Sequence, residues 1–150
     1  MNLGKIVDNQ REYFYSGQTK TKDFRKDNLY KLKAIIKRYE EIILQALNND
    51  LGKSNFEAYS TELMMVYGEI DLAIKNLDKW MSPIHEKTPI FSMPAKSYTL
   101  YEPLGVTLIL SPWNYPFSLA IDPLVEAVAA GNTVILKTSR KSKETSKVIR

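Results

Sequence analysis

Apolar residues recur at helical spacing through most of the first 82 residues. Between Asp23 and Leu51 they are separated by steps of three or one, and charged residues fill the positions between them. This spacing predicts one amphipathic helix that ends at Gly52. Its apolar positions are Leu29, Leu32, Ile35, Ile36, Tyr39, Ile42, Ile43, Ala46 and Leu47.

A second helix is predicted from Ser54 to the residue before Pro83. Ser54 and Glu57 have the spacing of a capping box, which opens a helix. Apolar residues then recur every three or four positions, at Tyr59, Leu63, Val66, Tyr67, Ile70, Ile74, Leu77 and Trp80. A shorter helix is predicted around Lys5–Tyr15.

Prolines interrupt residues 83–104 and predict an extended path. Within this segment, Lys96–Tyr101 is typical of a strand, whereas a linker that runs over the helices fits the composition equally well. His85 is expected on the surface.

Residues 105–137 have the pattern of one β-α-β unit. Gly105–Leu110 is a continuous apolar run, as expected of a strand buried on both faces. Two parallel strands joined by a helix fit the lengths. The remaining predicted parts are a loop at Ser111–Pro116, a helix at Phe117–Ala130, a strand at Asn132–Lys137 and a helix within Thr138–Arg150.

The predicted fold class is α/β, with N-terminal helices followed by the first β-α-β unit of a Rossmann-like parallel sheet. The segments are 1–82 (helical), 83–104 (extended) and 105–150 (sheet unit). Two parallel strands cannot bury both faces of a sheet alone, so we expect the N-terminal portion of a longer α/β protein. A compact α+β domain with a frayed last helix is the alternative.

Composition excludes several kinds of site within this chain. The 150 residues contain no cysteine and one histidine, which excludes disulfides, a cysteine nucleophile and multi-histidine metal sites, and we expect no metal. No apolar run is long enough to span a bilayer, and the N-terminus lacks the apolar core of a signal peptide. The expected location is the cytoplasm.

The net charge of +4 is concentrated near the C-terminal end, where residues 137–150 carry +5. Such a segment can contact nucleic acid or an anionic membrane, which would make the chain a binding module. It has no interleaved aromatics and no nucleic-acid motif, so a solvated helix face is the better interpretation and no nucleic-acid partner is expected.

Candidate chemistry lies where the two strands end, because ligands of open α/β sheets bind beyond the carboxyl ends of the strands. Ser111–Pro116 and Lys137–Arg140 follow adjacent strands and should be neighbours. The chain has no glycine-rich nucleotide fingerprint. Lys137 can reach a ribose or phosphate, or lie in water. Asn114 can donate to an oxyanion or satisfy its own turn. Trp113 can wall a groove or pack in the core.

These segments together resemble the aldehyde dehydrogenase superfamily, in particular its class 3 branch of fatty and aromatic aldehyde dehydrogenases. The resemblance runs in order through residues 100–139. Its motifs are Glu102-Pro-Leu-Gly-Val106, Ser111-Pro-Trp-Asn-Tyr-Pro-Phe117, Pro123-Leu-Val-Glu-Ala-Val-Ala-Ala-Gly-Asn132 and Thr133-Val-Ile-Leu-Lys-Thr-Ser139.

The resemblance implies oxidation of an aldehyde to a carboxylic acid with NAD or NADP, through a cysteine thiohemiacetal and a thioester that glutamate-activated water hydrolyses. It implies that Asn114 stabilises the oxyanion and that Lys137 binds the adenine ribose. It further implies a homodimer, with 96–101 as an assembly strand. The cofactor-binding residues that it implies are Leu110, Ser111, Pro112, Trp113, Asn114, Lys137, Ser139 and Arg140.

Two departures from the family pattern matter. The nucleophilic cysteine and the glutamate base lie beyond residue 150 in family members, so this chain alone is expected to be inactive. Arg140 stands where the family usually has a glutamate that grips the ribose hydroxyls. Arg140 can therefore pair with the 2′-phosphate of NADP, or point to solvent and leave NAD preferred.

Other interpretations stay open at this point. A reductase of acyl-CoA or acyl-phosphate can use the same fold, although Pro112-Trp-Asn114 favours an aldehyde oxidiser. An inactive fragment, poorly soluble because its sheet edge is unpaired, is expected for the 150 residues by themselves.

Overall fold

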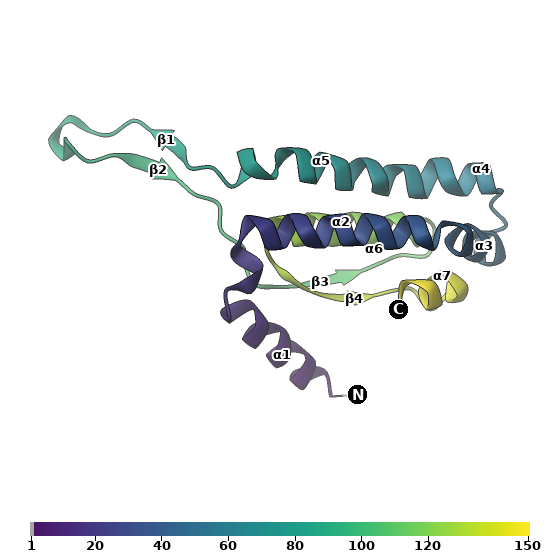
Figure 1. Cartoon of the computed structure of the whole chain (residues 1–150). Coiled ribbons are helices and arrows are strands. Elements are labelled where there is room, and N and C mark those ends of the chain that lie inside the picture. Colours follow the sequence, from purple (N-terminus) through teal and green to yellow (C-terminus); the bar gives the residue numbers. More distant parts are fainter. Residues whose placement is uncertain (1) are drawn as a thin grey trace.

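The computed structural model describes residues 2–150, which form stacked layers and one projecting arm (Figure 1). This arrangement confirms the α/β class. The helices are α1 (Leu3–Tyr15), α2 (Lys22–Arg38), α3 (Glu40–Leu51), α4 (Asn55–Ala58), α5 (Met64–Trp80), α6 (Ser118–Ala130) and α7 (Lys143–Ile149). The strands are β1 (Ile84–Glu86), β2 (Ser97–Thr99), β3 (Val106–Leu110) and β4 (Thr133–Lys137).

The predicted β-α-β unit is confirmed. Strands β3 and β4 pair in parallel, from Val106 opposite Thr133 to Leu110 opposite Lys137, and α6 is the crossover between them. Helices α6, α2 and α5 stack on one side of this sheet, while α1 lies on the other (Figure 1). Gly131 ends α6 with a φ of 86°, a left-handed conformation that glycine adopts without a steric penalty.

The expectation that β3 is buried on both faces is wrong. Ile109 faces α6 and is only 7% exposed, but Leu108 and Leu110 are 61% and 65% exposed. Successive side chains of a strand point to opposite faces, so both leucines lie on the face where α1 packs. That single helix leaves them uncovered.

The prediction of a single helix between Asp23 and Leu51 is wrong, because the chain bends at Tyr39 and forms two helices, α2 and α3. Tyr39 has a φ of −101° and a ψ of 11°, and it ends α2 and begins α3. The bend turns Ile43 and Leu47 into the core, while the predicted core positions Ile35, Tyr39 and Ile42 are 41% to 56% exposed. No proline or glycine marks the bend, and the apolar spacing continues through it.

The segment predicted to be extended forms the arm. Strand β2 falls inside the predicted strand Lys96–Tyr101, so the alternative of a linker that runs over the helices is wrong. It pairs antiparallel with β1, a strand that the sequence analysis did not predict. His85 is exposed on β1, as expected. The helix predicted within Thr138–Arg150 begins only at Lys143, and residues 138–142 form a loop.

One cluster of buried apolar residues joins the first helices to the sheet unit. Its largest fully buried members are Leu29, Leu47, Leu63, Val66, Ile70, Leu77 and Val125. Of the helices formed by residues 2–150, none has the length and apolar character needed to cross a membrane.

Candidate functional site

The two candidate loops start side by side at one edge of the sheet. Leu110 and Lys137 are the last pair of the β3–β4 ladder, and the Ser111 N–H donates to the Lys137 carbonyl at 3.0 Å. The expectation that Ser111–Pro116 and Lys137–Arg140 are neighbours is therefore confirmed. Residues beyond both strand ends can contact one ligand.

Asn114 lies in the loop between β3 and α6, and its side chain is exposed. Its amide makes no hydrogen bond to any of residues 2–150, so both N–H groups are free to bind a ligand. The alternative that the Asn114 amide hydrogen-bonds to the backbone of its own turn is therefore wrong.

Trp113 is 49% exposed, so the interpretation that it packs in the core is wrong. The ammonium of Lys141 lies 5.5 Å from the centre of its ring. This cation–π contact joins the β3–α6 loop to the loop that precedes α7. Leu110, Pro112 and Trp113, at and just after the end of β3, are all exposed apolar residues.

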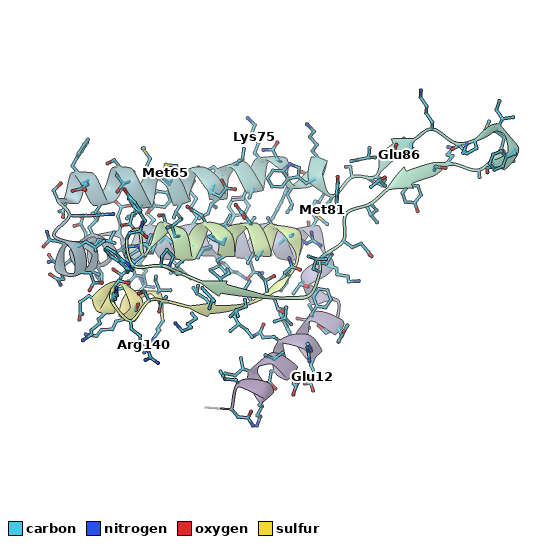
Figure 2. All side chains as sticks on the ribbon, turned by 180° about the vertical axis from the view of Figure 1, so that it is seen from behind. Glu12, Met65, Lys75, Met81, Glu86 and Arg140 are labelled. Atoms are coloured by element: carbon cyan, nitrogen blue, oxygen red, sulfur yellow. The ribbon has the colours of Figure 1, made fainter. Side chains whose placement is uncertain are left out.

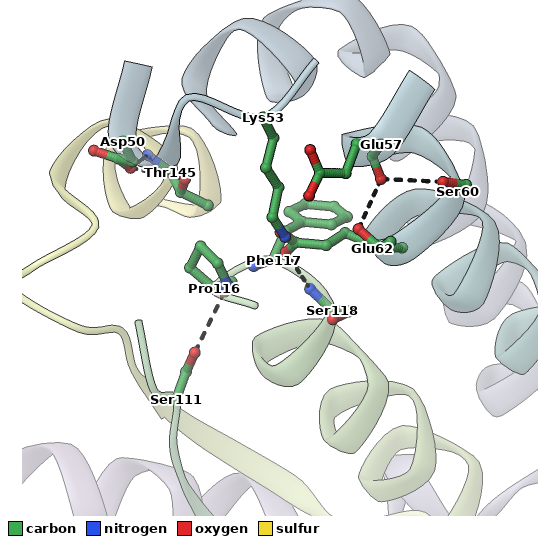
Figure 3. A network of polar contacts seen from close by, with 11 residues as sticks. Asp50, Lys53, Glu57, Ser60, Glu62, Ser111, Pro116, Phe117, Ser118 and Thr145 are labelled. Atoms are coloured by element: carbon green, nitrogen blue, oxygen red, sulfur yellow. Dashed lines mark hydrogen bonds and ion pairs between the residues drawn. The ribbon is translucent and has the colours of Figure 1, made fainter. Parts of the chain in front are cut away.

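Ser111 closes the base of the Asn114 loop. It is 8% exposed, and its hydroxyl lies 3.3 Å from the carbonyl oxygen of Pro112 and 3.3 Å from that of Pro116. Figure 3 shows the contact with Pro116. A single hydroxyl proton can serve one of these carbonyls at a time, and either bond ties the two ends of the loop together. The side chain is thus occupied inside the protein rather than turned to solvent.

Glu62 and Lys53 hold the far end of this loop, and the sequence analysis missed both. Glu62 is fully buried in the π-helical segment Tyr59–Leu63 that joins α4 to α5. Its Oε1 lies 2.5 Å from the Lys53 ammonium. Its Oε2 accepts the N–H of Phe117 at 2.8 Å and of Ser118 at 3.3 Å, at the beginning of α6 (Figure 3).

A signal for Glu62 exists in the sequence. Glu62, Val66 and Ile70 are spaced by four residues, which places a carboxylate on the buried face of the predicted helix. Buried carboxylates are rare unless they are paired, so a charged residue within an apolar stripe marks a polar network. Nothing local predicts that its partners are Lys53 and the backbone of residues 117 and 118.

Asp50 holds the second loop in the same manner. Its carboxylate accepts the N–H of Glu144 at 3.0 Å, and the N–H and hydroxyl of Thr145 at 2.7 and 2.8 Å. Helix α7 has no side-chain cap of its own at Ser142, so an acidic residue of α3 supplies it. Both strand-to-helix turns of the sheet unit are therefore fixed by carboxylates from the N-terminal helices.

Lys137 and Arg140 are exposed, and neither ammonium nor guanidinium lies within ion-pair distance of a carboxylate of residues 2–150. Arg140 projects away from the helical layers (Figure 2). Ser139 differs, because its hydroxyl accepts the Lys141 N–H at 3.2 Å and its carbonyl accepts the Ser146 hydroxyl at 2.8 Å. The two cations are thus available to an anionic or hydroxyl-rich ligand.

A cavity of about 640 Å³ opens at the base of the arm, between the ends of α5 and α6. Arg25, Trp80 and Tyr101 line it, and none of the predicted site residues does. Within residues 2–150 no cluster of histidine and acidic side chains is placed to hold a metal ion. The strand ends carry an exposed amide donor, two cations that make no ion pair with residues 2–150, and exposed apolar side chains.

Comparison with known families gives one match over almost the whole chain. Residues 2–149 match the sequence model of the aldehyde dehydrogenase family. Among curated relatives, the chain is 44% identical over 140 residues to 4,4'-diaponeurosporen-aldehyde dehydrogenase of Staphylococcus aureus. It is 45% identical over 136 residues to aldehyde dehydrogenase family 3 member F1 of Arabidopsis thaliana. These alignments cover 93% and 91% of this chain, but 30% and 28% of the relatives.

A solved structure has the same fold. The substrate-bound state of Staphylococcus aureus AldH superposes with a TM-score of 0.94 at 43% identity, over 99% of this chain and 33% of that one. The chain thus spans about a third of the length of the proteins that it resembles.

Proposed function

Because the chain belongs to the aldehyde dehydrogenase family, we propose that the complete protein oxidises an aldehyde to a carboxylic acid with NAD or NADP. The observation that carries this proposal is the free amide of Asn114, exposed in the loop after β3, whose first residue, Ser111, is hydrogen-bonded to Lys137. An uncharged donor in a fixed loop suits a developing oxyanion.

In the proposed reaction, Asn114 acts on the substrate carbonyl. A cysteine thiolate attacks the aldehyde carbon and gives a thiohemiacetal, and the Asn114 N–H donates to the oxygen that becomes negative. This chain has no cysteine, so the nucleophile must come from outside these 150 residues. From the resemblance to the family, we expect the glutamate that activates water for thioester hydrolysis to lie beyond residue 150 as well. When bound, NAD(P) supplies the hydride acceptor.

The residues at the strand ends fit a dinucleotide. Leu110, Pro112 and Trp113 offer an apolar surface, and exposed Lys137 has no carboxylate partner among the described residues, so its ammonium can donate to ribose hydroxyls. We assign the groove to Leu110, Ser111, Pro112, Trp113, Asn114, Lys137, Ser139 and Arg140. Ser111 and Ser139 shape its backbone, since their hydroxyls are engaged internally.

We further propose a homodimer in the cytoplasm, assembled through the β1–β2 arm. Apolar side chains at the tip of the arm, Ile90 and Phe91, are 91% and 89% exposed, which is unusual unless a partner covers them. Substituting both by serine should shift the complete protein toward the monomer in sedimentation equilibrium. An unchanged dimer would place assembly elsewhere.

The test of the activity uses the complete protein with an aliphatic or aromatic aldehyde and either cofactor. Formation of NADH or NADPH with release of the free acid is the expected result. Asn114→Ala should lower kcat by about a hundredfold or more with cofactor binding retained. Asn114→Asp keeps the side-chain volume but removes the N–H donor, so it should lower kcat by a similar factor. Near-normal turnover in folded Asn114→Ala, or a product formed only as acyl-CoA, would contradict the proposal.

A further inference from the structure

The Lys53–Glu62 pair caps the N-terminus of α6 at a high cost in desolvation free energy. A local serine or aspartate at the first position would cap α6, yet Phe117 stands there and offers no side-chain hydrogen bond. The cap comes instead from a carboxylate 55 residues earlier in the chain that has no exposed surface. Burying such a charge costs several kcal/mol unless a partner and hydrogen bonds compensate.

Glu62 has such a partner and such hydrogen bonds, and they also fix the position of the start of α6. Both oxygens of Glu62 are engaged, one by the Lys53 ammonium and the other by two backbone amides of α6. Lys53 is itself 8% exposed. A displacement of the start of α6 would therefore take two backbone donors away from a buried carboxylate, and this cost opposes movement of that end of the loop.

The same ammonium also contacts the residue next to Asn114. The Lys53 Nζ lies 4.1 Å from the centre of the Tyr115 ring, so one charge binds both the helix cap and the Tyr115 side chain. Both sequence neighbours of Asn114 are therefore held by cation–π contacts: Tyr115 by Lys53 and Trp113 by Lys141. Its own amide remains unbonded within the described chain.

We propose that Lys53 and Glu62 are positioning residues for Asn114: together they hold the β3–α6 loop so that the amide meets the oxyanion of the reacting aldehyde. The inference rests on the proposed function. An oxyanion donor works only if it is already in place, and a displacement of about 1 Å at a reacting centre can cost about a hundredfold in rate. Neither residue touches the substrate, so their effect must pass through residues 115–118.

The experiment compares Glu62→Gln with the matched control Glu57→Gln in the complete protein. Glu57 lies five residues earlier and close to the pair (Figure 3), but its side chain is exposed and makes no hydrogen bond to the loop, so the control makes the same chemical change without removing the cap of α6. For Glu62→Gln we expect kcat to fall by about tenfold or more while the dissociation constant of the cofactor changes by less than about threefold. The control should match the wild type.

A double-mutant cycle separates positioning from general destabilisation. If Glu62 acts through Asn114, Glu62→Gln should cause little further loss of kcat in an Asn114→Ala background. An additive loss would mean a merely structural role and would overturn the inference, as would an unchanged kcat in the single variant. Should Glu62→Gln not fold, Lys53→Met/Glu62→Gln removes both charges together, and the same two criteria apply to it.

Amide hydrogen exchange gives a readout that does not depend on turnover. In Glu62→Gln the amides of residues 113–115, 117 and 118 should exchange faster than in the wild type, with the rest of the sheet unit unchanged. Unchanged exchange in this loop overturns the positioning role whatever the kinetics. If the loop loosens but the wild type oxidises no aldehyde, the proposed function is wrong, and the catalytic half of this inference fails with it.

Discussion

The guanidinium of Arg25 fills the space in which a Cβ atom of residue 131 would lie. The Cζ of Arg25 is 2.5 Å from that position, and its Nη2 is closer still. Arg25 is 6% exposed, and it donates to the carbonyls of Thr19 and Ala129 at 3.0 and 3.1 Å. A cation from α2 thus closes the carboxyl end of α6, where the helix dipole is negative.

Gly131→Ala should therefore be strongly destabilising. Alanine at a φ of 86° costs about 1–2 kcal/mol by itself, and the added methyl must also displace a buried guanidinium. Gly52→Ala is the matched control, since Gly52 also ends a helix with a positive φ but has nothing within 4 Å of its Cβ position. Chemical denaturation of the complete protein should show a clearly larger loss for Gly131→Ala. Equal losses would mean that Arg25 moves aside freely.

Asp122 introduces a pH dependence into α6. Burial raises the pKa of its carboxyl to about 6, and the negative charges of Glu69, Glu126 and Glu62 act in the same direction. Its Oδ1 is buried without a hydrogen-bond partner among the described residues. The pKa in the unfolded chain is about 3.9, so the folded protein binds the proton more tightly.

The stabilisation from Asp122 is consequently present below about pH 4 and is lost as the pH rises through about 6. Asp122→Asn should raise the Tm of the complete protein at pH 8, and the gain should shrink toward pH 4. Glu41→Gln, an exposed position on α3, should give no such pH-dependent difference. A constant difference between wild type and Asp122→Asn across this range would show that the carboxyl does not titrate there.

Asp50→Asn should loosen the loop that carries Lys137 to Arg140. The substitution keeps one acceptor but removes the charge that holds the backbone of Glu144 and Thr145. We expect the cofactor to bind about tenfold more weakly, which corresponds to about 1.4 kcal/mol, with kcat at saturating cofactor little changed. Asp27→Asn, exposed on α2, is the control. A loss confined to kcat would contradict this assignment of Asp50.

The sheet unit was predictable because its signals are local. An apolar run, a turn-rich segment, a helix stopped by Gly131 and a second apolar run define β3, α6 and β4 without reference to the rest of the chain. Their parallel pairing follows from the length of the connection. The adjacency of the Asn114 and Lys137 loops then follows from the geometry of parallel strands.

The features that escaped prediction depend on distant partners. The bend at Tyr39 has no local marker and is set by the packing of α3 against α7 and α4. Strand β1 consists of three exposed residues, which adopt a strand conformation because they pair with β2. Glu62 and Asp50 cap helices that begin more than fifty residues later. Sequence spacing carries no information about such pairings.

Arg140 is the residue on which the choice of cofactor should depend. It is exposed in the loop after β4, three residues beyond Lys137, and no carboxylate of residues 2–150 neutralises it. A 2′-phosphate on the adenine ribose would find a guanidinium able to form two parallel hydrogen bonds. NAD lacks this phosphate and cannot form that pair of hydrogen bonds.

Arg140→Glu should therefore shift the ratio of kcat/KM for NADP to that for NAD toward NAD, by about tenfold or more, because a favourable charge contact becomes a repulsive one. Lys143→Glu makes the same change of charge three residues further on, at the exposed start of α7, and should move the ratio far less. Equal shifts in the two variants would indicate only the general field of this basic segment. An unchanged ratio in Arg140→Glu would mean that the guanidinium points to solvent and takes no part in cofactor choice.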